Sequence, residues 1–173
     1  MKGTIVKCLQ DLVTNNFGKD KWEKSLEDAG LSKSSIFLPV ADVEDSQVMK
    51  VVGSVCKTLN ISLQQAAEAF GDYWVNVYSQ KLYNQYYQKS KSSKEFLLEL
   101  DNVHVIMTRP MQNAKPPRFE YEWKDGRTLI MNYKSQRGLI DFMVGLVKGV
   151  GKFYKENLSV TKLSSNKVQI VFP

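Results

Sequence analysis

Residues 116–127 read PPRFEYEWKDGR, and at this stretch the sequence changes from one periodicity to another. The aromatic residues Phe119, Tyr121 and Trp123 alternate with charged residues, which is the two-residue period of a β-strand. The prolines ahead of them disfavour helix, and the Asp-Gly pair that follows favours a tight hairpin turn. The stretch therefore predicts the first hairpin of an antiparallel sheet.

Before this stretch the sequence has helical periodicity, because apolar residues recur at spacings of three and four positions. Ser62 and Gln65 have the spacing of a capping box, which predicts the start of the longest helix. Asp20 and Glu23 predict a second capping box nearer the start of the chain. Besides two helices before Gly30, we expect helices at about 46–59, 62–80, 83–87 and 92–108.

After the stretch the sequence predicts more strands and one more helix. Helices followed by an antiparallel sheet with one late helix make an α+β fold. The four expected strands form one antiparallel sheet, in which the Asp-Gly hairpin and a closing hairpin are the two pairs. We expect strands at about 119–124, 128–135, 158–163 and 168–172, and the late helix at 139–154.

The chain has 173 residues, the length of one domain. We expect a single domain over residues 1–173, with a helical part of about 1–110 and a sheet-bearing part of about 111–173. A content of 43% hydrophobic and 24% charged residues excludes disordered and fibrous classes. No apolar run approaches the ~18 residues of a membrane span. Two cysteines, Cys8 and Cys56, are too few for a disulfide scaffold, so we expect a soluble, cytoplasmic protein.

Positive charge is concentrated in the later part of the chain. Residues 104–173 hold 12 of the 24 Lys and Arg residues but only 5 of the 18 acidic residues. A basic surface suits nucleic acid or an acidic protein partner, and it also occurs on surfaces without any partner. The basic residues are scattered rather than grouped on one helix, and no nucleic-acid-binding motif is present. A nucleic-acid-binding protein therefore stays open only as an alternative.

Signatures of catalysis are missing from the sequence. It contains neither a phosphate-binding loop of the GxxxxGK type nor a dinucleotide-binding GxGxxG fingerprint. A Ser-His-Asp triad would have to use His104, the only histidine. No cluster of His, Cys and carboxylates has the spacing of a metal site. We therefore expect that the chain is not an enzyme.

His104 itself allows two interpretations. It lies near the end of an expected helix, and Val103, Val105 and Ile106 make its neighbourhood apolar. Such a histidine is often only a core or surface residue. An imidazole that points into an apolar cavity also suits the role of sole protein ligand to a haem iron. From the residue alone, both interpretations stand.

A second group of polar residues follows the expected second strand. Tyr133, Ser135 and Arg137 alternate, so in an extended segment their side chains lie on one face. A phenol, a hydroxyl and a guanidinium offer three hydrogen-bond donors, and arginine binds a carboxylate bidentately. The three residues suit a small dianionic group, although an ordinary polar strand face would have the same pattern.

Taken together, His104 and the Tyr-x-Ser-x-Arg motif about thirty residues later resemble the haem-nitric oxide/oxygen-binding (H-NOX) family. This family includes domains similar to the haem regulatory region of soluble guanylate cyclase. The resemblance extends over essentially the whole chain, in order and in spacing. Its segments are MKGTIV (1–6), AFGDYW (69–74), LDNVH (100–104), PPR (116–118) and GLVKG (145–149).

The resemblance implies a haem b cofactor (iron protoporphyrin IX), buried between the helical and the sheet-bearing parts. It implies that His104 is the axial ligand of the iron and that Tyr133, Ser135 and Arg137 bind the two haem propionates. Ile5 and Pro117 match residues that press on the porphyrin and keep it non-planar. The resemblance also implies that Leu9, Trp74, Tyr78 and Phe142 lie on the side where the gas binds, and that Leu146 is a further residue of the haem pocket.

The gas is expected to be nitric oxide or carbon monoxide. Family members that hold oxygen use a distal tyrosine hydroxyl as donor, and the matching residue here is Phe142, which has none. The loss of such a hydrogen bond in a dry site is worth about 1–3 kcal/mol. An oxygen-binding haem sensor remains the alternative, with Trp74 or Tyr78 as donor.

The resemblance also implies a switch rather than a reaction. Binding of nitric oxide weakens the bond between iron and His104, and the helix that bears His104 is then released. Family members without an output domain, as this chain is expected to be, are bacterial and signal in trans. The expected effector is a histidine kinase or a diguanylate cyclase, and the basic half is a candidate docking face for it.

Overall fold

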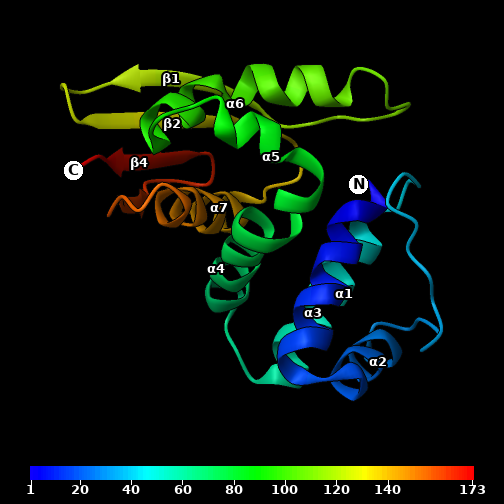
Figure 1. Ribbon diagram of the computed structural model, residues 1–173. Coiled ribbons are helices and arrows are strands. Elements are labelled where there is room, and N and C mark those ends of the chain that lie inside the picture. Colours follow the sequence, from blue (N-terminus) through cyan, green and yellow to red (C-terminus); the bar gives the residue numbers. More distant parts are fainter. The chain divides into compact units, whose positions relative to one another are not determined.

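The computed structural model describes residues 1–173, which divide into two compact units, Met1–Ala66 and Ala67–Pro173 (Figure 1). Each unit has buried apolar residues of its own. No helix is long and apolar enough to cross a lipid bilayer. The elements confirm the expected α+β fold, with helices first and then a four-stranded antiparallel sheet that includes one late helix.

The first unit is helical. Trp22 and Leu26 are fully buried where the second helix packs against its neighbours, since it contacts both the first and the third. The capping box expected from Asp20 and Glu23 is absent, because the N-cap residue is Gly18 and no side chain caps this helix. Glu23 instead pairs with Lys19 at 3.0 Å. The helices are α1 (Gly3–Phe17), α2 (Lys19–Asp28) and α3 (Asp45–Leu59).

The capping box expected at Ser62 is confirmed. The Gln65 backbone N–H donates to the Ser62 hydroxyl at 3.1 Å, and the Ser62 N–H donates to the Gln65 side chain at 2.9 Å. The helix that follows is not the single helix expected over 62–80, since it widens into a π-helix. The elements in order are α4 (Leu63–Tyr73), the π-helix η1 (Trp74–Tyr78), α5 (Gln80–Gln88) and α6 (Ser93–Thr108).

The sheet has the strand order β1-β2-β4-β3, with every pair antiparallel. The expected Asp-Gly hairpin joins β1 to β2, and the Asp125 carboxylate accepts from the backbone N–H groups of Arg127 and Thr128, each at 2.8 Å. These bonds hold the pKa of Asp125 below its usual range. The elements are β1 (Arg118–Trp123), β2 (Thr128–Lys134), α7 (Ile140–Phe153), β3 (Ser159–Lys162) and β4 (Lys167–Val171).

Helices α6 and α7 cover the sheet, α6 against β1 and α7 against β3 and β4 (Figure 1). Leu129, Met131 and Ile170 are fully buried in the core that they share. Helix α7 also crosses α4 at very close range. A Cβ atom added to Gly71 would lie 2.1 Å from the carbonyl carbon of Gly145, so only glycine allows the two backbones to approach this far.

Candidate functional site

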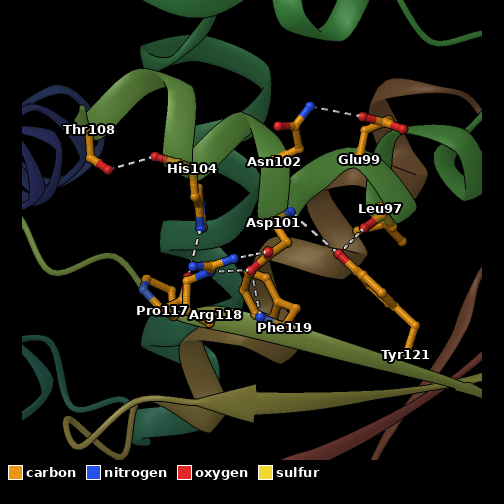
Figure 2. Close-up of polar contacts among 10 residues, drawn as sticks. All are labelled: Leu97, Glu99, Asp101, Asn102, His104, Thr108, Pro117, Arg118, Phe119 and Tyr121. Carbon is orange, nitrogen blue, oxygen red and sulfur yellow. Dashed lines mark hydrogen bonds and ion pairs between the residues drawn. The ribbon is translucent and has the colours of Figure 1, made fainter. Parts of the chain in front are cut away.

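His104 lies on α6 and points toward the chain segment that leads into β1 (Figure 2). Its Nδ1 is 3.3 Å from the backbone carbonyl oxygen of Pro117. A carbonyl only accepts hydrogen bonds, so this contact places the ring proton on Nδ1. In the neutral ring, Nε2 then keeps a free lone pair, which is the state in which a histidine binds a metal.

The surroundings of His104 favour the neutral ring. Burial lowers the pKa of His104 below its ordinary value of 6.5, while the Pro117 carbonyl and the Asp101 carboxylate act in the opposite direction. The ring of Phe119 packs beside the imidazole, with 5.5 Å between the ring centres. A neutral imidazole beside an aromatic ring is suited to bind a cofactor that is largely apolar.

Asp101, one helical turn before His104, connects α6 to β1 (Figure 2). Arg118 donates to its two carboxylate oxygens from Nε at 2.8 Å and from Nη2 at 2.6 Å. The Phe119 backbone N–H donates to the same carboxylate at 2.9 Å. The Arg118 guanidinium holds the pKa of Asp101 below its usual range.

The Tyr133, Ser135 and Arg137 group is only partly extended. Strand β2 ends at Lys134 and a turn follows, so the expected alternation does not continue as far as Arg137. Tyr133 is buried and packs on Phe119, with ring centres 6.1 Å apart. The turn still keeps the other two residues together, because the Arg137 N–H donates to the Ser135 hydroxyl at 3.3 Å.

Arg137 also reaches back to the segment before β1. Its guanidinium donates to the Lys115 carbonyl at 2.5 Å. This contact joins the end of β2 to the segment that carries Pro117. The polar group expected to bind propionates therefore lies in contact with the same segment that accepts from His104.

Four aromatic side chains form a contiguous row on the helices of the second unit. Phe142 of α7 meets Phe70 edge to face at 5.4 Å between ring centres. Phe70 stacks on Trp74 at 5.9 Å, and Trp74 stacks on Tyr78 at 5.5 Å. Three residues expected around the gas, namely Phe142, Trp74 and Tyr78, are thus brought together, and Phe70 connects them.

The remaining expected pocket residues lie on two helices and on the segment before β1. Leu146 is half-buried on α7, and Pro117 is half-buried before β1. Ile5 and Leu9 lie on α1 in the first unit, where Leu9 is buried and Ile5 half-buried. Their contact with haem stays a prediction.

Comparison with known proteins identifies the family. A family model described as haem-NO-binding matches residues 2–162, which is most of the chain. The chain belongs to this haem-NO-binding (H-NOX) family. H-NOX domains bind haem and sense diatomic gases.

Solved H-NOX structures resemble the chain over nearly its whole length. A crystal structure of an oxygen-binding H-NOX domain related to soluble guanylate cyclases is 26% identical, with a TM-score of 0.83 over 99% of this chain and 95% of that one. A mutant of the Cs H-NOX domain with an unnatural amino acid at site 5 is also 26% identical, with a TM-score of 0.86 over 99% of this chain and 96% of that one.

A much longer protein is also similar. Soluble guanylate cyclase gcy-35 of Caenorhabditis elegans is 24% identical over 171 residues, which is 96% of this H-NOX chain. The chain spans only 25% of the length of that relative. The similarity therefore concerns one domain of the cyclase and not its whole length.

The donor set of this H-NOX domain fits haem. No group of three or more His, Cys, Asp or Glu side chains could hold a bare metal ion. A single neutral His104 supplies one ligand, which is sufficient only for a metal that brings its other ligands along, as haem iron does with its porphyrin nitrogens. Burial raises the pKa of the Cys8 and Cys56 thiols, so neither offers a ready thiolate.

Sequence reasoning missed two features of this H-NOX site. The Asp101–Arg118 pair was not expected, although Asp101 stands three residues before His104, on the same helix face, and Arg118 directly follows Pro117. Phe119, which contacts both His104 and Tyr133, was predicted only as an alternating strand residue. A search for charged residues one helical turn from the histidine would have found Asp101 but not its partner Arg118, which lies 17 residues further along the chain.

Proposed function

We propose that this H-NOX domain is a haem b sensor of nitric oxide that acts as one domain over residues 1–173. The observation that carries the proposal is the hydrogen bond between Nδ1 of His104 and the Pro117 carbonyl. It leaves Nε2 free as the axial ligand, in a chain whose family binds haem. When bound, haem would supply an iron centre that takes a diatomic gas.

The polar group at the end of β2 is proposed to hold the haem propionates. Tyr133, Ser135 and Arg137 offer donors of three kinds, and an arginine pairs with a carboxylate bidentately. The Arg137 guanidinium now donates to the Lys115 carbonyl, so a propionate would share or replace that acceptor. Ile5 and Pro117 are proposed to pack against the porphyrin as the apolar part of the site.

The aromatic row is proposed to determine which gas is held. Phe142 has no hydrogen-bond donor, and oxygen depends on such a donor more than nitric oxide or carbon monoxide does. Without it, oxygen loses about 1–3 kcal/mol of stabilisation in a dry pocket. A domain that takes nitric oxide and carbon monoxide but forms no stable complex with oxygen is the expected result.

Oxygen binding is a second candidate, which one observation favours. Trp74, stacked between Phe70 and Tyr78, carries an indole N–H in the same aromatic row. A similar solved structure is an H-NOX domain in complex with oxygen. If the Trp74 N–H or the Tyr78 hydroxyl reaches the gas, it replaces the donor that Phe142 lacks.

The signal is proposed to pass in trans to an effector, a histidine kinase or a diguanylate cyclase in a bacterial cytoplasm. Basic side chains suit an acidic partner, because complementary charge accelerates and orients docking. Exposed cations of the second unit include Arg109, Lys155 and Lys167.

An absorption spectrum of the reduced protein without air tests the proposal, repeated after nitric oxide, carbon monoxide and air are added separately. We expect a five-coordinate ferrous haem that takes the first two gases and forms no stable complex with oxygen. A stable oxygen complex would support the second candidate. Absence of haem, even after reconstitution, would refute both.

A further inference from the structure

Helix α6 and strand β1 are joined by a row of polar contacts (Figure 2). On the helix, positions 97, 101 and 104 lie on one face, since they are spaced by four and three residues. The Tyr121 hydroxyl donates to the Leu97 carbonyl at 2.8 Å. The Asp101 carboxylate accepts from the Phe119 backbone N–H near the start of β1. His104 contacts the carbonyl of Pro117, the residue just before β1. The row ends at the proposed iron ligand.

Asp101 is the centre of this row. Its carboxylate accepts hydrogen bonds from Nε and Nη2 of Arg118 and from the Phe119 backbone N–H. We call these contacts of Asp101 with Arg118 and Phe119 the clamp. Two parallel bonds from a guanidinium fix direction as well as distance. Because Pro117 directly precedes Arg118, the position of its carbonyl relative to α6 depends on this clamp.

The energy of the clamp argues for a role in geometry rather than in stability. The Arg118 side chain is 58% exposed and that of Asp101 is 21% exposed. Ion pairs of this exposure contribute little to the free energy of folding. The backbone bond from Phe119, by contrast, ties the main chain of β1 to α6 at a fixed register.

We propose that Asp101 is a positioning residue for the haem ligand. Through Arg118 and the Phe119 amide it keeps the Pro117 carbonyl at Nδ1 of His104, and it thereby strengthens the bond from Nε2 to iron. The inference rests on the proposed function. The physical reason is that a hydrogen bond to the second ring nitrogen fixes the orientation of a metal-binding histidine and makes it a stronger donor.

The proposal predicts that loss of the clamp loosens the bond between His104 and iron. Mutation of a residue that supports a metal ligand in this way typically lowers metal affinity or activity by 10–100-fold. Asp101 acts through one further residue, so the lower end, about tenfold, is expected for the rate at which His104 leaves iron after nitric oxide is added. The iron–histidine stretching frequency of the ferrous protein should fall at the same time.

Two variants, Asp101→Ala and Arg118→Ala, remove the clamp from its two sides. The control is Glu120→Gln on the same strand, which breaks the exposed ion pair between Glu120 and Lys134 (3.1 Å). Resonance Raman spectra give the stretching frequency, and stopped-flow absorption gives the rate of histidine release. We expect both clamp variants to change in the same direction, the double variant to change no further, and Glu120→Gln to match the wild type.

A measurement without haem separates this inference from the proposed function. In haem-free protein, ¹⁵N NMR of the imidazole reports which ring nitrogen carries the proton. We expect the Nδ1–H form in the wild type and a shift toward the Nε2–H form in Asp101→Ala or Arg118→Ala. If Asp101→Ala does not fold, Arg118→Ala, which changes an exposed side chain, carries the test.

Unchanged tautomer, stretching frequency and release rate in the folded clamp variants would overturn the positioning role while haem binding stood. A wild type that binds no haem would refute the proposed function instead. The tautomer measurement would then still decide whether Asp101 controls the contact between His104 and Pro117.

Discussion

At the scale of single residues, the iron ligand can be removed by one substitution. His104 is the only histidine, so no other imidazole of the chain can take its place. We expect His104→Gly to bind haem only when free imidazole is supplied, because the imidazole fills the space and takes over the ligand role. Absorption spectra of reconstituted protein, with and without imidazole, measure this.

The control for this experiment is Thr108→Val. It removes the hydroxyl that donates to the His104 backbone carbonyl at 2.7 Å but leaves the ring in place. Haem binding without imidazole should persist in this control. An unchanged ferrous spectrum in His104→Gly would contradict the assignment of the ligand.

A second residue-scale prediction concerns Phe142. The change Phe142→Tyr adds a hydroxyl to the aromatic row, where it contacts Phe70. A donor there is worth about 1–3 kcal/mol, so oxygen should dissociate roughly 10–100-fold more slowly. Flash photolysis or stopped-flow mixing measures the rate.

Phe153→Tyr is the matched control for Phe142→Tyr. It adds the same hydroxyl to the same helix, but at a position that packs on Tyr87 and Tyr154. Oxygen binding should stay as in the wild type. If Phe142→Tyr also leaves oxygen binding unchanged, Phe142 does not determine the selectivity.

At the scale of elements, the junction of α6 and β1 predicts a pH dependence of stability. Arg118 holds the pKa of Asp101 below its ordinary value of 3.8. A carboxyl whose pKa is lowered by folding stabilises the folded state above its unfolded pKa. That contribution is lost as the pH falls from 3.8 through the lower pKa of the folded state.

Urea unfolding of haem-free protein between about pH 6 and about pH 3 tests this. The difference in free energy of unfolding between the wild type and Asp101→Asn should be constant in the upper part of the range and shrink at its acid end. In an Arg118→Ala background, Asp101→Asn should show a weaker pH dependence, because the main cause of the shift is gone. A difference that does not vary with pH would contradict the prediction.

At the scale of the whole molecule, the second unit depends on the close crossing of α4 and α7. A Cβ atom on Gly71 would lie 2.1 Å from the Gly145 carbonyl carbon, so Gly71→Ala forces the helices apart. Overpacking of this kind typically costs about 1–3 kcal/mol. We expect a loss of at least this size in the free energy of unfolding, measured with urea.

Gly53→Ala on α3 is the control for the crossing. A Cβ atom there meets nothing within 4 Å. Alanine at an open helix position should stabilise by about 0.5–1 kcal/mol, since glycine costs more conformational entropy. Equal effects of the two substitutions would mean that the crossing tolerates separation.

Local signals in the sequence determined much of this fold. Alternating aromatic residues and an Asp-Gly pair predicted the β1–β2 hairpin, and Ser62 with Gln65 predicted the start of α4, because each signal acts over a few neighbouring residues. Asp20 and Glu23 failed as a capping box, since Gly18 already occupies the N-cap position. The π-helix over Trp74–Tyr78 was not predictable from periodicity. Apolar and aromatic residues keep the three- and four-residue spacing of an α-helix through it, at positions 70, 73, 74, 77 and 78.

Some features of the candidate site likewise follow from the sequence alone, and others only from the tertiary structure. The sequence by itself determined that His104 is the one possible imidazole ligand and that Phe142 lacks a donor, since these facts depend only on residue type. Only the tertiary structure decided that Nδ1 of His104 meets the Pro117 carbonyl and that Asp101 clamps Arg118. These partners stand 13 and 17 residues apart along the chain, and no local preference brings residues together at such separations until α6 packs on β1.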